Sequence, residues 1–139
     1  MEARSAEQAT VLLIDDEQDV LTTLESVLTG GGYICYTCSN AEEAFERVGQ
    51  ITPDLIISDI NLAGHSGLTL CERLKQESAC AEIPVMFLSG AQIPDIIRRA
   101  HAAGGTYYLR KPFDPEVLLE LVDKAMWMPH LVGRQLARA

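Results

Sequence analysis

The stretch Leu55-Ile56-Ile57-Ser58-Asp59 decides the fold, because it is a short apolar run that ends abruptly at an acid. Other short runs end in the same way, at polar residues: Val11–Ile14 at Asp15 and Asp16, Val85–Leu88 at Ser89, and Thr106–Leu109 shortly before Lys111. Runs of this length and composition are typical of strands that are buried on both faces of a parallel sheet. The carboxyl ends of such strands lie along one edge of the sheet, where ligands bind. We therefore expect these carboxylates, the hydroxyl and the ammonium group to converge on a single cleft.

Strand-like and helix-like segments alternate five times along the chain, which predicts an α/β fold with a parallel sheet. A further strand is expected at Tyr33–Cys38. The predicted helices begin near Glu17, at the capping pattern Asn40-x-x-Glu43, after a loop at 61–67, near Pro94, and at Asp114-Pro115. Helical spacing marks their buried faces; in the last helix this face comprises Val117, Leu118, Leu121, Val122 and Ala125.

The composition indicates one globular domain, because 139 residues with 47% hydrophobic content can bury a core. No apolar stretch approaches the ~18 residues that a membrane span needs, and the polar start lacks the apolar segment of a secretory signal. We therefore expect a cytoplasmic protein that does not associate with membranes. The net charge of −9 would repel a nucleic-acid backbone, so direct binding of nucleic acid is not expected.

The chain contains four cysteines, two of which, Cys35 and Cys38, have the spacing of redox and zinc motifs. On a strand, however, side chains three residues apart point to opposite faces, and the chain has no second such pair to complete a zinc site. We interpret all four as small buried residues of a reducing compartment.

The expected organisation is an N-terminal tail at residues 1–9, a folded domain at 10–125, and a C-terminal tail or the start of a linker at 126–139. The last segment contains Pro129 and two arginines but no acid. It could extend the last helix, cross to a partner, or lead into a further part of a longer protein, and the sequence leaves these alternatives open.

The predicted cleft has the donors for a divalent cation and a phosphoryl group. Mg²⁺ prefers oxygen ligands, and Asp15, Asp16 and Asp59 together suit that preference. A bound dication and Lys111 would keep Asp59 ionised, and an ionised aspartate can attack phosphorus to form an aspartyl phosphate. Lys111 and the Ser89 hydroxyl can supply the positioning and charge neutralisation on which phosphoryl transfer depends. Alone, Asp15-Asp16 would be read as an ordinary charge pair at a helix N-terminus; the arrangement of all five residues after separate strands favours a site.

At these residues the chain resembles the receiver domain of two-component response regulators, from about Thr10 to Ala125. Four motifs carry the resemblance: Val11–Glu17, Leu55–Ile60 with Asp59, the hydroxyl of Ser89, and Tyr107–Phe113 with Lys111. Ser89 follows Asp59 by 30 residues and Lys111 follows Ser89 by 22, and both spacings fit the family. Ala63 is a departure, because the family commonly has a proline there.

The resemblance implies a flavodoxin-like doubly wound (βα)5 fold with a five-stranded parallel sheet in the strand order 2-1-3-4-5. It also implies that Asp59 accepts phosphate from a histidine kinase or a histidine phosphotransfer protein. Asp16, Asp59 and the backbone carbonyl of Asn61 would bind Mg²⁺ directly, with Asp15 acting largely through water. Ser89 and Lys111 would hold the phosphoryl oxygens, and the Lys111-Pro112 bond would be cis, which is plausible only before proline.

The resemblance further implies how phosphorylation is read out. Tyr108 would turn inward when Ser89 moves toward the phosphate. The face made by the fourth helix, the fifth strand and the fifth helix would then change its partners, which could be a downstream protein, an output domain or a second copy of the chain. A shift of this kind needs two states that differ by only a few kcal/mol.

Two other interpretations belong to different classes of protein. An Mg²⁺-dependent phosphatase could form the same aspartyl phosphate, but enzymes of the haloacid-dehalogenase type place an acid two residues after the nucleophile, and here that residue is Asn61. An unphosphorylated docking module would not need the acidic set. The primary expectation is therefore a phosphorylation-activated signalling switch, which phosphorylates and dephosphorylates itself and is not a turnover enzyme.

Overall fold

The computed structural model describes residues 8–62, 64–77, 80–90 and 95–138, with the backbone alone at 127–138. Its centre is a parallel sheet of five strands in the order β2-β1-β3-β6-β7. The strands are β1 (Thr10–Ile14), β2 (Ile34–Cys38), β3 (Leu55–Asp59), β6 (Val85–Ser89) and β7 (Tyr107–Arg110). Numbered among themselves, these strands have the order 2-1-3-4-5, so the predicted flavodoxin-like topology is confirmed.

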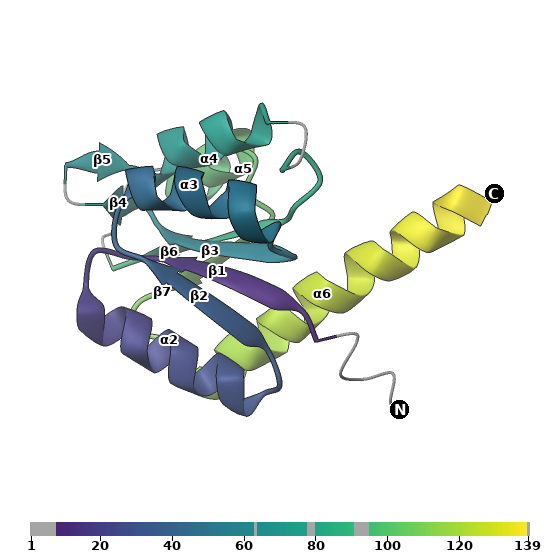
Figure 1. Cartoon of the computed structure of the whole chain (residues 1–139), viewed down its shortest axis with the longest axis horizontal. Coiled ribbons are helices and arrows are strands. Elements are labelled where there is room, and N and C mark those ends of the chain that lie inside the picture. The colour runs from purple at the N-terminus through teal and green to yellow at the C-terminus, as the bar shows by residue number, and fades with distance from the viewer. Residues whose placement is uncertain (1–7, 63, 78–79, 91–94, 139) are drawn as a thin grey trace.

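Helices cover both faces of the sheet (Figure 1). On one face lie α3 (Ala41–Ile51), α4 (Gly67–Lys75) and α5 (Ile96–Ala102), and on the other lie α2 (Gln18–Gly30) and α6 (Pro115–Arg138). This double cover explains why the central strands read as continuous apolar runs, since each residue faces one of two cores. Among helices in the described part of the chain, none is long and apolar enough to span a membrane.

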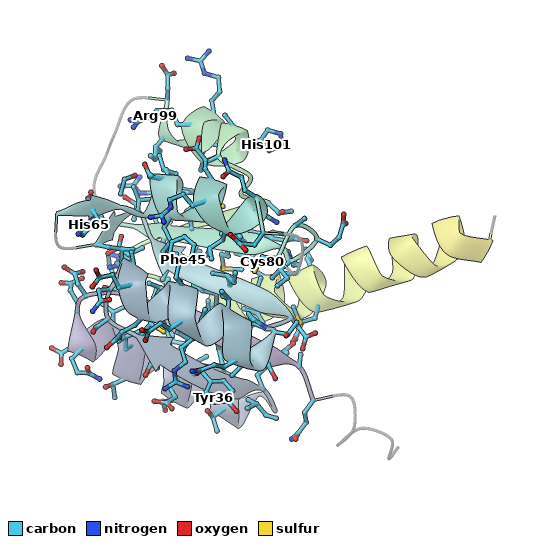
Figure 2. All side chains as sticks on the ribbon, turned by 45° about the horizontal axis from the view of Figure 1, so that its top comes forward. Tyr36, Phe45, His65, Cys80, Arg99 and His101 are labelled. Carbon is cyan, nitrogen blue, oxygen red and sulfur yellow. The ribbon has the colours of Figure 1, made fainter. Side chains whose placement is uncertain are left out.

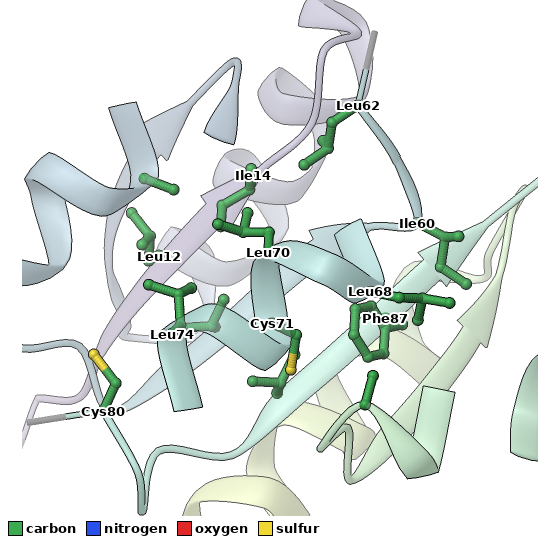
Figure 3. Packing of buried hydrophobic residues seen from close by; sticks show 14 of the residues in the cluster. Leu12, Ile14, Ile60, Leu62, Leu68, Leu70, Cys71, Leu74, Cys80 and Phe87 are labelled. Atoms are coloured by element: carbon green, nitrogen blue, oxygen red, sulfur yellow. The ribbon is translucent and has the colours of Figure 1, made fainter. Parts of the chain in front are cut away.

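The strand residues alternate between the two cores. Leu12, Ile14 and Phe87 pack with Leu70 and Leu74 of α4 beneath the first helical layer (Figure 3). Their neighbours Val11, Leu13, Ile57 and Met86 pack against α2 and α6 on the other side. Burying each such side chain contributes roughly 2 kcal/mol to folding, so the strand ends are held by a rigid frame.

The helix caps follow the sequence signals. The Asn40 side chain accepts a hydrogen bond from the Glu43 amide at 2.9 Å, and Asp114 Oδ1 accepts one from the Glu116 amide at 2.8 Å. The glycine run ends α2, where Gly32 adopts a positive φ of 97°. These contacts fix where α3 and α6 start and where α2 ends relative to the sheet.

The segment 61–67, predicted to be a loop, contains a short antiparallel hairpin of β4 (Asn61–Leu62) and β5 (His65–Ser66). Ser66 then caps α4, because its hydroxyl accepts hydrogen bonds from the amides of Leu68 and Thr69 at 3.1 and 3.3 Å. At Gly67 the backbone of α4 meets the end of β3, and the Gly67 amide donates to the Ile60 carbonyl at 2.6 Å. The loop that follows Asp59 is thereby tied to α4.

One predicted core residue is exposed, the last helix follows one of the alternatives left open for it, and two residues named above fall outside the described structure. Val117 is 41% exposed, so the buried stripe of α6 is narrower than predicted and runs through Leu118, Val122 and Ala125. The last helix continues to Arg138. Pro94 and Ala63 lie outside the described residues.

Candidate functional site

The predicted site residues lie at the carboxyl ends of neighbouring strands. Asp59 is the last residue of β3 and Ser89 the last of β6, while Asp15 directly follows β1. The strand register sets Asp59 beside Leu88 and Ser89 beside Arg110, one residue before Lys111. Since the strands are parallel, these ends share one edge, and the structure brings Asp15, Asp59 and Lys111 into direct contact there.

The Lys111 ammonium is the centre of the site. Its Nζ atom lies 2.9 Å from Asp15 Oδ2, 2.9 Å from Asp59 Oδ2 and 3.0 Å from Glu17 Oε1. The side chains of Asp15 and Asp59 are 0% and 9% exposed, whereas that of Glu17 is 63% exposed. One cation therefore joins two buried carboxylates to a third carboxylate at the surface.

Backbone groups hold the acids in place. Asp15 Oδ1 accepts a hydrogen bond from the Glu17 amide at 2.9 Å, and Asp59 Oδ1 accepts one from the Asn61 amide at 3.2 Å. The Lys111 amide donates to the Ser89 carbonyl at 2.9 Å, which fixes the start of the lysine side chain beside β6. The second oxygen of Asp15 is buried and has no aligned hydrogen bond, although Lys111 lies at ionic distance.

Burial and neighbouring charged groups both shift the pKa values of Asp15 and Lys111. Burial raises the pKa of the Asp15 carboxyl, and the charge of Asp59 adds to this, against the lowering effect of the hydrogen bond from the Glu17 amide and of the nearby Lys111 ammonium. Burial alone would lower the pKa of Lys111, but its contacts with the carboxylates of Asp59, Asp15 and Glu17 outweigh burial and raise that pKa. Lys111 thus stays charged. The negative charge of the three carboxylates around it exceeds the single positive charge of its ammonium group.

This donor set suits a hard divalent cation. Carboxylate oxygens of Asp15, Glu17 and Asp59 all lie within 4.8 Å of one another. A buried carboxylate oxygen without an aligned hydrogen bond, in a pocket with surplus negative charge, is what a cation such as Mg²⁺ would satisfy. The residues present therefore fit the predicted metal.

The acids of this pocket differ in part from those expected. Glu17 belongs to the group and was not predicted as a site residue. The side chain of Asp16 is exposed and is not one of the three acids that lie within 4.8 Å, so its role as a metal ligand stays a prediction. The signal for Glu17 was present in the sequence, because it is the third acid in succession after β1.

The other predicted residues lie on β6 and β7 or directly after β7. Ser89 is buried at the end of β6, and the Lys111–Pro112 peptide bond is cis. Tyr108 is half-buried against the core under α3, α4 and α5, whereas Tyr107 packs on the opposite core. Tyr108 is thus the tyrosine that faces α5.

Histidines and cysteines lie elsewhere. His65 on β5 and His101 on α5 are both exposed (Figure 2). Cys35 and Cys38 pack in opposite cores, as expected for a strand. Burial raises the pKa of Cys38 and of Cys71 to about 11, which keeps both thiols protonated near neutral pH.

Comparison with known proteins agrees with this geometry. Residues 11–123 match the sequence model of the response regulator receiver domain. The transcriptional regulator NtrC of Escherichia coli K12 is 34% identical over 116 residues, which are 84% of this chain and 24% of NtrC. The phosphate regulon regulator PhoB of Pseudomonas aeruginosa is 32% identical over 110 residues, 79% of this chain and 48% of PhoB. The chain thus spans about a quarter to a half of these relatives.

Solved structures show the same fold. The chemotaxis protein CheY4 of Vibrio cholerae matches 85% of this chain and 98% of its own, with a TM-score of 0.81 and 28% identity. NtrX of Brucella abortus matches 94% of this chain and 29% of its own, with a TM-score of 0.84 and 27% identity. The likeness extends over nearly the whole of this chain.

Proposed function

The chain belongs to the response regulator receiver domain family of two-component systems, and from that premise we propose that it is a switch controlled by phosphorylation of Asp59. Receiver domains are generally non-catalytic signalling modules. The observation that carries the proposal is the contact of Lys111 with both Asp59 and Asp15, which places a fixed cation beside an ionisable nucleophile at the ligand-binding edge of the sheet.

Asp59 would take its phosphoryl group from a phosphohistidine of a histidine kinase or a histidine phosphotransfer protein. A carboxylate oxygen of Asp59 forms a bond to phosphorus while the P–N bond of the donor breaks, and the imidazole leaves with the electron pair of that bond. Lys111, already 2.9 Å from Asp59 Oδ2, is positioned to neutralise a phosphoryl oxygen. The Ser89 side chain, at the end of the adjacent strand β6, would hold another. Hydrolysis of the acyl phosphate by water returns the carboxylate and releases inorganic phosphate.

Mg²⁺ bound at this site would neutralise charge on the acids and on the incoming phosphoryl group. The residues proposed to hold it are Asp15, Asp16, Asp59 and the backbone carbonyl of Asn61, with Glu17 within reach of the same pocket. The Asn61 amide, which donates to Asp59 Oδ1, keeps that residue close to the pocket.

Tyr108 and Ser89 would connect the site to the surface. Ser89 ends the strand that pairs with β7, and Tyr108 lies on β7 with its side chain half-buried toward α5. A movement of Ser89 toward phosphate would leave room for Tyr108 to turn inward. The face of α5, β7 and α6 would then change its affinity for a downstream protein, an output domain or a second copy. The segment 126–139 would be a C-terminal tail or the start of a linker.

The test is incubation with Mg²⁺ and acetyl phosphate, followed by intact-mass measurement. We expect one added phosphoryl group in the wild type, none in Asp59→Asn, and unchanged labelling in Asp19→Asn, which removes an exposed acid of α2 outside the pocket. Wild-type protein that takes no phosphate, or Asp59→Asn protein that labels as well as wild type, would contradict the proposal.

A further inference from the structure

Glu17 makes a side-chain contact that its position at the start of α2 does not explain. It stands at the N-cap of α2, with φ −98° and ψ 114°, yet its side chain makes no capping hydrogen bond. An acid at this position would ordinarily stabilise the helix N-terminus. Instead the carboxylate crosses the pocket to Lys111, 94 residues further along the chain, at 3.0 Å.

The Lys111 ammonium has three donors, and three carboxylates lie within 3.0 Å of it. A phosphoryl group on Asp59 would bring one oxygen to this ammonium in place of Asp59 Oδ2, and a second phosphoryl oxygen could bind it only by displacing Asp15 or Glu17. Asp15 is fully buried and would lose its counter-ion without gaining water, whereas Glu17 is 63% exposed and can be hydrated as it leaves. Glu17 is thus the carboxylate that is easiest to displace.

We propose that Glu17 is a positioning residue for the phosphoryl switch: it holds Lys111 in the unmodified domain and competes with the phosphoryl oxygens for the same ammonium group. This inference rests on the proposed function. The Glu17 carboxylate lies at the surface and acts through Lys111, and its charge has two opposite effects. The carboxylate attracts a cation to the pocket, and it opposes an anion on Asp59 both by repulsion and by occupying Lys111.

The experiment compares Glu17→Gln with wild type in two equilibrium measurements. Calorimetry gives the dissociation constant for Mg²⁺. Titration with beryllium fluoride at saturating Mg²⁺, followed by the amide resonances of Ser89 and Lys111, gives the affinity for an anion that binds a carboxylate oxygen with the shape and charge of a phosphoryl group. Glu25→Gln is the matched control, because it removes the same charge from an exposed position of α2 away from the pocket.

We expect Glu17→Gln to raise the dissociation constant for Mg²⁺ and to lower that for beryllium fluoride, each about two- to fivefold, as fits an exposed ion pair. Glu25→Gln should change neither constant by as much as twofold. A residue with a purely structural role would weaken both ligands, so any combination other than these opposite signs overturns the inference. Wild-type protein that binds neither ligand overturns the proposed function and this inference together.

Discussion

Replacing Gly67 with alanine should destabilise the protein strongly, because the end of β3 leaves no space for a side chain there. A Cβ atom at Gly67 would lie 2.0 Å from the carbonyl oxygen of Asp59 and 3.1 Å from Cα of Ile60. Both neighbours are backbone atoms, which cannot rotate away as a flexible side chain could. Real Cβ atoms essentially never come closer than 3.0 Å, so α4 and β3 must separate by about 1 Å.

The size of the effect follows from this separation. Overpacking of a rigid site typically costs 1–3 kcal/mol, and we expect about 3 kcal/mol because the hydrogen bond between the Gly67 amide and the Ile60 carbonyl would also be strained. For a domain of this size, that loss lowers the midpoint of thermal unfolding by roughly 10 °C. Urea unfolding followed by circular dichroism measures the free-energy difference directly.

Gly49→Ala is the matched control, because it makes the same chemical change within α3, where a Cβ atom would meet nothing within 4 Å. It should stabilise the protein by about 0.5–1 kcal/mol, since alanine favours a helix interior over glycine. If the free energy of unfolding of Gly67→Ala protein lay within about 0.5 kcal/mol of the wild-type value, the close approach of α4 to the phosphoacceptor strand would be refuted.

Three further predictions concern charge and burial. Asp15→Asn removes a buried charge whose pKa is raised, so in EDTA at pH 7 it should stabilise the protein by about 1 kcal/mol, and it should reduce the further rise in unfolding temperature that Mg²⁺ gives the wild type. Lys111→Met leaves two buried acids without their cation and should cost about 3 kcal/mol at pH 7. Because the folded pKa of Lys111 is raised, this advantage of the wild type is complete below pH ~10 and is lost as the pH rises further. With a disulfide reagent at pH 8, half-buried Cys35 should react first, and Cys38 and Cys71 only as fast as the protein unfolds.

Each of these has a result that would contradict it. Asp15→Asn protein that is less stable than wild type in EDTA would show that the Lys111 contact outweighs the cost of burying the charge. A stability difference between wild type and Lys111→Met that does not decrease at all as the pH rises above ~10.5 would mean that the ammonium is not the stabilising group. Rapid labelling of Cys71 in the folded protein would contradict its position in the core.

The sequence was sufficient for the residues whose position is set by strand topology. Asp59 and Lys111 could be brought together in advance, because each follows an apolar strand and parallel strands end at one edge. The two-sided cover of helices and the caps at Asn40 and Asp114 also followed from the apolar runs and local chemistry, whereas the strand order came from the resemblance to receiver domains. These features depend on the backbone, which repeating patterns report well.

The features that were missed depend on where individual side chains point. An acid at the start of a helix has an ordinary electrostatic role, and only the distance to Lys111 shows that Glu17 is used otherwise. The strands of the β4–β5 hairpin contain two residues each, too few for any alternation to be seen. Val117 is exposed because the buried stripe of α6 is narrow. Helical periodicity alone does not give the width of that stripe.

Only the first part of the last helix, α6, packs against the domain. Its first part packs on the sheet through Leu118 and Val122, and the remainder points away from the body (Figure 1). From residue 126 to Arg138 the axis advances about 18 Å, so a small tilt at the base becomes a displacement of several ångströms at the tip. Inserting one residue in that arm would turn whatever follows by about 100°, whereas inserting seven would nearly restore its direction. The length of the helix would thus determine both the position and the rotation of its C-terminal end relative to the domain.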